Sequence, residues 1–556
     1  MKSASRVNGK NILVGVISLI IMGLCLFNTQ NATVPFILND EYGYWSNATW
    51  LMGYDWSSTV NEISWYSFGY SFILAIIIFL VKDLLLAYKV AILLNCILLV
   101  LSYVFLYVIS FRFINKYNEW YAIVPVMYCS NWVNKNYAWP EILLFFLFIL
   151  VTFMMIKIYE TQAVKWYVLL GTCLIFMYMV HMRTISIIIA SCIFLFFTSY
   201  KKKNAYIYFL LIMGLGIILQ IILKKYFVTN LWLSSTASNS NGYASVIPSS
   251  ISEITIDLFG SIISSFIGKL FYIVVTTMGA VVFMLQKLVS IRKRGIKERE
   301  LRRDIIIYLM LCFVLSIGVS SVFQRNPQYT THVLYGRYIE YIVAPIILIS
   351  TILFFEEKES CKKFFCNGTM VVCISGLVVA NAIEKTQLAQ VNIPINSVGL
   401  SVFYLNGKID LYSVILIYSL LNYIFMIVKE KYSKYSCTIL IFIALIWFGI
   451  GQHAYKGQEA WSNNIISKKE LARLCVEIAE EPEKEIYVYR GSSYWKSHAC
   501  AEIIQFYYPN KKISYVNLED LEYINEGIVF CITEDYSNSI QEKLDKHSIK
   551  MYLVDK

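Results

Sequence analysis

The sequence predicts an α-helical polytopic membrane protein that ends in a small C-terminal α/β domain. Of its 556 residues, 58% are hydrophobic and 15% are charged, against roughly a quarter charged in an ordinary soluble domain. The mean hydropathy is +0.58. The net charge of +11 is unevenly divided, because residues 1–452 carry +15 and residues 453–556 carry −4. A basic, apolar body with an acidic tail excludes a soluble enzyme and a nucleic-acid-binding protein.

Thirteen stretches approach the length of about 20 mostly apolar residues that a membrane-crossing helix needs. They are residues 12–27, 87–110, 119–136, 140–157, 166–181, 184–199, 204–222, 262–289, 305–323, 338–355, 368–384, 410–428 and 436–452. The first is preceded by basic residues, but no small-residue cleavage site follows it, so we interpret it as an anchor and not as a signal peptide. One more apolar run, residues 66–81, is ambiguous from its length alone.

The charges of the loops decide how the run at 66–81 is placed. Cytoplasmic loops of membrane proteins carry an excess of Lys and Arg. Most of the basic loop residues fall on the cytoplasmic side if the N-terminus is cytoplasmic and residues 66–81 do not cross. We therefore expect a re-entrant or interfacial helix at 66–81 on the outer face, and an extracytoplasmic C-terminal domain. The frequent Lys, Ile, Asn and Tyr residues favour a bacterial plasma membrane.

Two sequence motifs are missing, and their absence argues against an ATP-driven pump and a membrane zinc protease. The sequence contains no G-x-x-x-x-G-K-[ST], the phosphate-binding loop of ATP-driven pumps, and no H-E-x-x-H of membrane zinc proteases. The expected cytoplasmic segments are also too short for a nucleotide-binding domain. Any chemistry is therefore expected at the outer interface, where an activated substrate would be carried by a lipid.

The first outer loop, within residues 28–86, holds the densest polar cluster of the body. Asp40 and Glu41 are adjacent, and Tyr44 follows Asp40 by four residues, which places both on one face of a helix. Aromatic residues surround them, as in the belts that lie at lipid headgroups, where the two carboxylates would simply be solvated. Carboxylates held against a membrane face are instead partly desolvated, which makes one of them a candidate proton acceptor.

This loop resembles that of the GT-C superfamily of membrane glycosyltransferases, most closely the protein O-mannosyltransferases and the lipid A aminoarabinose transferases. Their loop carries D-E-x-x-Y, then a stretch with Tyr, Pro and Gly, then an apolar interfacial helix. Here the motif is Asp40, Glu41 and Tyr44, followed by YSFGYSF at 66–72 and the run to 81. Ser67 and Phe68 stand where the family often has Pro. The resemblance implies a GT-C-like fold over the transmembrane body.

The resemblance also implies a reaction. The family transfers a sugar, with inversion, from a polyprenyl- or dolichyl-phosphate-linked donor to an acceptor. Asp40 would be the base that deprotonates the acceptor hydroxyl, and Glu41 its neighbour. The resemblance leaves open a divalent cation, Mg²⁺ or Mn²⁺, held by Asp40 and Glu41.

Other polar residues are expected at the outer ends of spans. Glu141 follows Pro140 at the start of the fourth span, where it suits the helix dipole, and family members often carry an acidic residue there that faces the site. His181 and Arg183 lie between the fifth and sixth spans. Arg183 can extend to the headgroups or hold a lipid phosphate, because guanidinium matches phosphate geometry.

Arg325, His332, Arg337 and Tyr338 precede the tenth span. They can meet anionic lipid, or they can bind substrate. The Arg337–Tyr338 pair resembles an Arg-Tyr pair in the family, and a fixed cation there would stabilise the departing lipid phosphate.

The tail alternates strand and helix patterns. Strands are expected at 485–491, 511–517, 527–533 and 549–555, and helices at 492–508, 518–524 and 537–547. This alternation favours a small parallel α/β domain at 485–556, joined to the body at 1–452 by a helical connector at 453–484.

The sequence therefore predicts a membrane glycosyltransferase. It would take a polyprenyl-phosphate-linked sugar and modify a hydroxyl of a lipid, a cell-surface polymer or a protein. Three alternatives stay open: a transporter or flippase of lipid-linked saccharides, a polysaccharide ligase or polymerase that uses the late-loop Arg and His residues, and a receptor or scaffold whose tail does the work.

Overall fold

The computed structural model describes most of the chain. The residues that it does not describe are 1, 28, 30–38, 61–64, 115, 199–202, 233–255, 292–296, 326–329, 358–361, 387–393, 406–407, 433–434, 479–483, 492–493, 525, 538–539, 541–547 and 555–556. The expected helix at 537–547 falls mostly outside the described residues.

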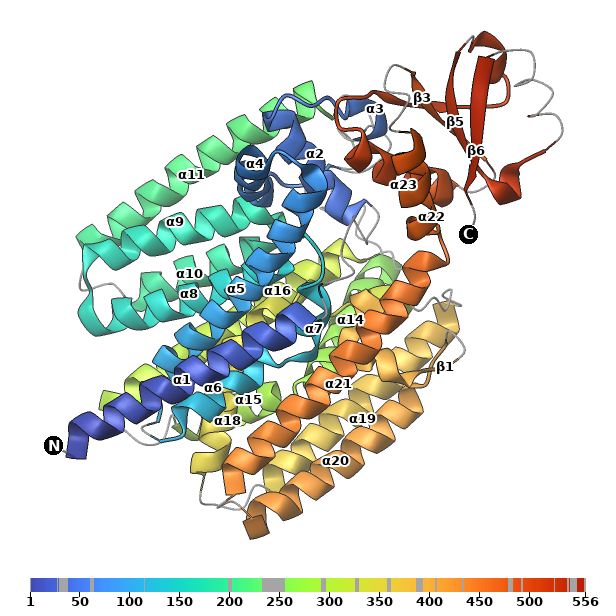
Figure 1. Ribbon diagram of the computed structural model, residues 1–556. Helices are drawn as coiled ribbons and strands as arrows, with labels where there is room; N and C mark the ends of the chain where they lie inside the picture. Colours follow the sequence, from blue (N-terminus) through green and yellow to red (C-terminus); the bar gives the residue numbers. More distant parts are fainter. Residues whose placement is uncertain are drawn as a thin grey trace.

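The body is a bundle of apolar helices (Figure 1). Among the described residues, eight helices are long and apolar enough to cross a membrane: 84–110, 141–161, 205–230, 256–276, 301–323, 362–385, 411–431 and 436–463. Five shorter apolar helices of 10–17 residues accompany them, at 11–27, 69–81, 164–180, 182–198 and 280–289. The expected polytopic helical body is therefore confirmed.

The first outer loop forms three helices after α1 (Lys2–Phe27). These are α2 (Asp40–Leu51), α3 (Ser57–Val60) and α4 (Gly69–Val81). The helix α4 corresponds to the ambiguous run at 66–81, and its 13 residues are too few to cross a bilayer. It packs against α2 and α5 (Leu84–Ser110), while Ile76, Phe79 and Leu80 stay exposed on its outer side.

Two of the expected spans are broken. The stretch 119–136 forms α6 (Asn118–Val126) and α7 (Cys129–Asn134), separated by a bend. Pro125 lies inside α6, and a proline removes a backbone donor and ends a helix nearby. The stretch 262–289 forms α14 (Ile256–Thr276) and α15 (Ala280–Ile291), because the chain turns at Gly279, whose φ is +78°.

The remaining helices complete the bundle. They are α8 (Glu141–Thr161), α9 (Val164–Val180), η1 (Met182–Thr184), α10 (Ile185–Thr198), α11 (Lys203–Asn230), α16 (Lys297–Phe323), α17 (Thr330–Val333), η3 (Glu340–Ile342), α18 (Val343–Glu356), α19 (Lys362–Thr386), η4 (Pro394–Asn396), η5 (Val398–Phe403), α20 (Leu411–Tyr432) and α21 (Ser436–Asn463). The short strands β1 (Tyr404–Leu405) and β2 (Lys408–Ile409) form a hairpin before α20.

The C-terminal domain is a four-stranded parallel sheet with helices beside it, as predicted. Its strands are β3 (Ile486–Tyr489), β4 (Ile513–Val516), β5 (Glu526–Ile532) and β6 (Ser548–Val554), in the order β4-β3-β5-β6. The domain also contains the helices α22 (Lys468–Ile478) and α23 (Tyr494–Tyr507) and the short 3-10 helices η7 (Asp520–Tyr523) and η8 (Thr533–Asp535). Figure 1 shows this domain at one end of the bundle, with α23 on the side of α2 and α3.

Candidate functional site

Four charged side chains from distant parts of the chain form one ion-paired network. Arg337 Nη1 lies 2.5 Å from Asp40 Oδ2, and Arg337 Nε lies 2.9 Å from Glu141 Oε1. Arg183 Nη2 donates to the other oxygen of Glu141, Oε2. The charges therefore alternate in sign along the row Asp40–Arg337–Glu141–Arg183, and the structure brings together four of the site residues that the sequence predicts.

Each member of this network stands at a helix end or a turn. Asp40 and Glu141 are the first residues of α2 and α8, where the helix dipole favours a negative charge. Arg183 lies in the short turn η1 between α9 and α10, and Arg337 lies just before η3. These positions bring the four charged groups together at helix starts and turns and not along the middle of an apolar helix.

Aromatic rings enclose the two guanidinium groups. The Cζ of Arg337 lies 3.7 Å from the ring centroid of Trp139, and the Cζ of Arg183 lies 4.8 Å from Tyr338 and 5.3 Å from Tyr341. Ring faces attract cations, so these contacts stabilise both arginines where they are buried. Burial alone would lower the pKa of Arg337, but Asp40, Tyr335 and Glu141 outweigh it and hold that pKa well above its ordinary value.

Asp40 is the accessible end of the network. Its side chain is 30% exposed, whereas those of Arg183 and Glu141 are at most 3% exposed. The Tyr66 hydroxyl donates to Asp40 Oδ1 at 2.6 Å. Burial, reinforced by the negative charge of Asp40, raises the pKa of Tyr66 well above its ordinary value, so this phenol stays a donor. Asp40 is thus a partly exposed carboxylate that holds two donors, and it can act as a proton acceptor when one of those donors is withdrawn.

Arg183 is the opposite end and has spare hydrogen-bonding capacity. Its Nε and Nη1 atoms are buried and have no hydrogen-bond partner in the structure. A buried unpartnered donor costs free energy, and a buried charge costs more. Two such donors on one guanidinium have the geometry that can bind a phosphate through parallel hydrogen bonds.

Glu41 points away from Asp40. Its Oε1 accepts hydrogen bonds from the Tyr88 hydroxyl at 2.7 Å and from the Ala138 amide at 2.6 Å, and the side chain is fully buried. A divalent cation shared by Asp40 and Glu41 does not fit this arrangement, because the two carboxylates have separate partners and Arg337 already supplies the positive charge at Asp40. Among the described residues, no group of three or more His, Cys, Asp and Glu side chains could hold a metal ion.

Three further predicted residues line the network. Tyr44 is buried, with its ring edge-on to Tyr66 and Tyr70 at centroid distances of 5.4 and 5.8 Å. His181 accepts a hydrogen bond from the Arg183 amide through Nδ1 at 3.3 Å. Its ring also lies 5.6 Å from that of Tyr338, so His181 and Tyr338 together hold the turn that carries Arg183.

Arg325 and His332 are placed differently. The carbonyl of Arg325 accepts a hydrogen bond from the Ser261 hydroxyl. The ring of His332 lies 6.3 Å from that of Tyr335, which in turn lies 4.7 Å from Tyr338. Burial, with the charge of Lys269, lowers the pKa of His332, which favours its neutral form. His332 therefore reaches the site only through Tyr335, and the contacts of Arg325 described here do not connect it to the ion-paired row.

Three site residues were not singled out as such in the sequence. Tyr66 looked like one aromatic residue among many, and Trp139 only preceded Pro140. Glu340 is buried, accepts a hydrogen bond from Tyr272 and interacts electrostatically with Glu141 and Arg183. Its spacing of three from Arg337 was a usable signal, because that spacing brings two residues to one side of a helical turn.

Gly43 fixes the place of Tyr66, and we expect Gly43→Ala to destabilise the protein by about 1–3 kcal/mol, the usual cost of overpacking. A Cβ at Gly43 would lie 2.1 Å from Cδ2 of the Tyr66 ring, so the ring or the helix must shift. Thermal unfolding in detergent measures the effect. Gly23→Ala is the control, because nothing lies within 4 Å of a Cβ there. Equal melting temperatures for the two variants would contradict the expectation.

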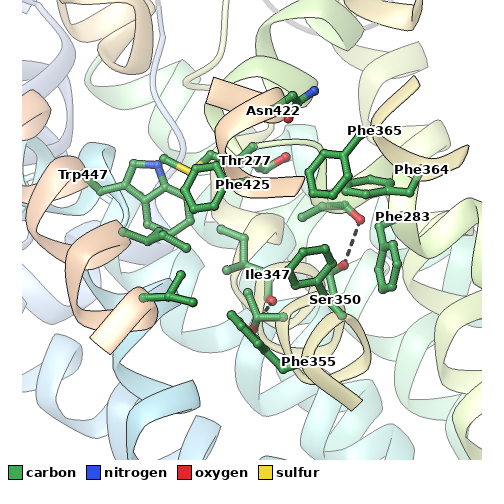
Figure 2. A pocket seen from close by; sticks show the side chains of 16 residues that line it. Thr277, Phe283, Ile347, Ser350, Phe355, Phe364, Phe365, Asn422, Phe425 and Trp447 are labelled. Carbon is green, nitrogen blue, oxygen red and sulfur yellow. Dashed lines mark hydrogen bonds between the residues drawn. The ribbon is translucent and has the colours of Figure 1, made fainter. Parts of the chain in front are cut away.

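The bundle also contains an apolar cavity of about 70 Å³ between α15, α18, α19, α20 and α21 (Figure 2). Figure 2 shows phenyl rings around it, among them Phe283, Phe355 and Phe364. The hydroxyl of Ser350 on its wall is bonded to the Ala280 carbonyl at 2.9 Å. A larger cavity of about 530 Å³ shares Met278, Asn422, Phe425 and Trp447 with it. The phenyl-lined cavity suits hydrocarbon and has no acid, base or cation in its lining.

Comparisons with known proteins give a distant structural likeness. The chain is similar to two crystal structures of ArnT from Cupriavidus metallidurans. For ArnT bound to undecaprenyl phosphate, the identity is 10% and the TM-score is 0.48; for the apo state they are 12% and 0.47. Both matches cover 98% of this chain and 90% of that chain. No protein-family model and no curated protein matches the sequence.

Proposed function

We propose that this chain is a membrane glycosyltransferase that moves a sugar from a polyprenyl-phosphate-linked donor to a hydroxyl group. The acceptor belongs to a lipid, a cell-surface polymer or a protein at the outer membrane face. The observation that carries the proposal is the row of alternating charges. It offers an accessible carboxylate, Asp40, at one end and a buried guanidinium with two unpartnered donors, Arg183, at the other.

The two ends match the two needs of the reaction. The acceptor oxygen attacks the anomeric carbon from the face opposite the phosphate, and the bond between that carbon and the phosphate oxygen breaks. The electron pair of that bond stays on the phosphate, and the hydroxyl proton passes to Asp40. Negative charge thus grows on the phosphate, where Arg183 and Arg337 stabilise it as preorganised donors.

Arg337 links the binding of the donor phosphate to the transfer of the proton to Asp40. Its guanidinium is shared by Asp40 and Glu141. A donor phosphate bound beside Arg183 competes with Asp40 for the guanidinium of Arg337. It draws Arg337 Nη1 away from Asp40 Oδ2. Asp40 then has an unoccupied oxygen for the acceptor hydroxyl, while the Tyr66 hydroxyl still holds Oδ1. Donor binding therefore prepares the base.

The proposal is tested first in a strain that lacks the gene. Mass spectrometry of its surface glycans is expected to show the loss of one sugar-containing mass, which returns with the wild-type chain, while the lipid-linked sugar accumulates on the outer face. Accumulation on the cytoplasmic face instead would indicate a flippase. An unchanged glycan and lipid profile would contradict the enzyme hypothesis.

Arg183→Lys is expected to weaken binding of a polyprenyl phosphate about 10- to 100-fold. Lysine can keep the pair with Glu141 but lacks the fork of donors, and a lost hydrogen bond to a charged group costs about 1.5–3 kcal/mol. Titration of the purified protein in nanodiscs measures the affinity. Arg112→Lys is the matched control, because Arg112 pairs with Glu160 at an exposed position. Unchanged affinity in Arg183→Lys would show that the phosphate binds elsewhere.

A further inference from the structure

The C-terminal domain packs against the first outer loop through one side chain of α23. Phe506 is almost fully buried, and rings from three segments surround it. Its centroid lies 5.2 Å from Trp45, 5.3 Å from Trp56, 6.3 Å from Tyr88 and 6.4 Å from Tyr42. It belongs to the hydrophobic core of the helical body and not to that of its own domain. Phe506 therefore anchors the domain to α2, the helix that begins with Asp40.

Glu502 lies one turn before Phe506 and reaches the start of α2. Its Oε1 and Oε2 accept the backbone N–H of Asn39 at 3.1 and 3.3 Å. The carboxylate is buried, and His498 Nε2 lies 3.2 Å from its Oε1. The other nitrogen of His498 lies 2.5 Å from the Tyr515 hydroxyl on β4. A row of polar contacts thus runs from the sheet of the domain to the residue that precedes Asp40.

Asn39 is the point where this support is needed. Its φ of 57° and ψ of −50° lie in a region that residues with a side chain rarely adopt. Its carbonyl accepts the Gly43 N–H at 2.9 Å, which begins α2, but its side chain makes no capping hydrogen bond. The described contacts that hold this turn against relaxation therefore include the carboxylate of Glu502.

We propose that Glu502 is a positioning residue for Asp40, and that the C-terminal domain completes the active site from outside the helical bundle. Glu502 fixes the strained turn at Asn39, and Phe506 holds α23 close enough for it to do so. The contact with α2 stands on the geometry alone, whereas its effect on turnover rests on the proposed glycosyl transfer. A domain that merely docks would lose stability when Glu502 is changed, without loosening α2 selectively.

Two variants of Glu502 separate these roles in the full chain in nanodiscs. Glu502→Ala removes the acceptor, and amide hydrogen exchange in the first turn of α2 is expected to rise about tenfold or more. With the proposed donor, kcat falls by a similar factor while the KM for the donor changes little. Glu502→Gln is expected to stay near wild type in both, because its amide oxygen accepts the same N–H. Glu477→Gln, at an exposed pair with Arg473, is the control.

The outcomes distinguish the two proposals. Wild-type exchange in α2 and wild-type kcat in Glu502→Ala would overturn the positioning role. If Glu502→Ala unfolds the whole domain, fast exchange is seen throughout β3 and β5. In that case Phe506→Ala is the variant that tests whether the domain positions α2. It leaves the core of the domain intact, and unchanged exchange in α2 would overturn the inference. If α2 depends on Glu502 but the wild-type chain transfers no sugar, the positioning role stands and the proposed function fails.

Discussion

Replacing Asp40 with Asn is expected to lower sugar transfer by about 10²- to 10⁴-fold, the range that a general base contributes. Asparagine keeps the shape of the side chain, and its carbonyl oxygen can still accept the Tyr66 hydroxyl that now lies 2.6 Å from Oδ1. It cannot accept the proton of the acceptor. Arg337 keeps its second partner, Glu141, so the fold is expected to survive the change. The measurement is transfer per unit of folded protein, with surface-glycan mass spectrometry at matched expression as the cellular readout.

Asp55→Asn is the matched control for this prediction. Asp55 lies in the same loop, is exposed and accepts the Ser57 amide at 3.0 Å, so its neutralisation is expected to leave transfer unchanged. Full activity in Asp40→Asn would show that Asp40 is not the base. The flippase hypothesis would then be favoured, together with the ligase or polymerase hypothesis, which depends on Arg325, His332 and Arg337.

Glu141→Leu is expected to reduce the free energy of unfolding by about 3–5 kcal/mol, the usual cost of breaking a buried ion pair. Glu141 is 3% exposed and is shared by Arg183 and Arg337. Its removal leaves Arg183, which already has two unpartnered donors, as a buried cation without its partner. Unfolding in detergent, followed by temperature or denaturant, measures the change.

A double variant tests whether the expected loss of stability comes from the pair between Glu141 and Arg183. Glu141→Leu with Arg183→Met removes both partners, so part of the lost stability is expected to return. Glu160→Gln is the control, because Glu160 forms more exposed pairs with Arg112 and Lys157, and such pairs contribute about 0–1 kcal/mol. Strictly additive effects of the two single changes would show that Glu141 and Arg183 are not coupled.

The charged members of the site could be predicted because each has a local signal. Glu141, Arg183 and Arg337 are ionisable residues next to apolar spans, where a charge needs a reason, and Asp40 stands in a D-E-x-x-Y pattern of the first outer loop. The sequence could not show that they pair with one another, because nearly 300 residues separate Asp40 from Arg337. Glu41 illustrates the limit of adjacency: consecutive residues on a helix do not face each other, so two neighbouring carboxylates enter different surroundings.

The breaks in two spans and the docking of the C-terminal domain could not be predicted from the sequence, for different reasons. Hydropathy averages over a window, so it did not register the bend after Pro125 or the turn at Gly279, although both residues are visible in the sequence. Glu502 gave no local signal, because a carboxylate on a helix of a small α/β domain is ordinarily solvated. Only the docking of α23 against the first outer loop gives this residue a role.

The alternating row has a consequence for the charge balance of the proposed reaction. Two carboxylates and two guanidinium groups sum to zero, so a donor with one negative charge on its phosphate brings the site to a total of minus one. After transfer, the phosphate has gained a second negative charge, but Asp40 has been neutralised by the acceptor proton. The total is unchanged, so the largely buried row never has to accommodate additional net charge, which a medium of low dielectric constant would penalise. Release of that proton to the outside would restore the negative charge of Asp40, which then competes with the product phosphate for Arg337 and so favours departure of the lipid.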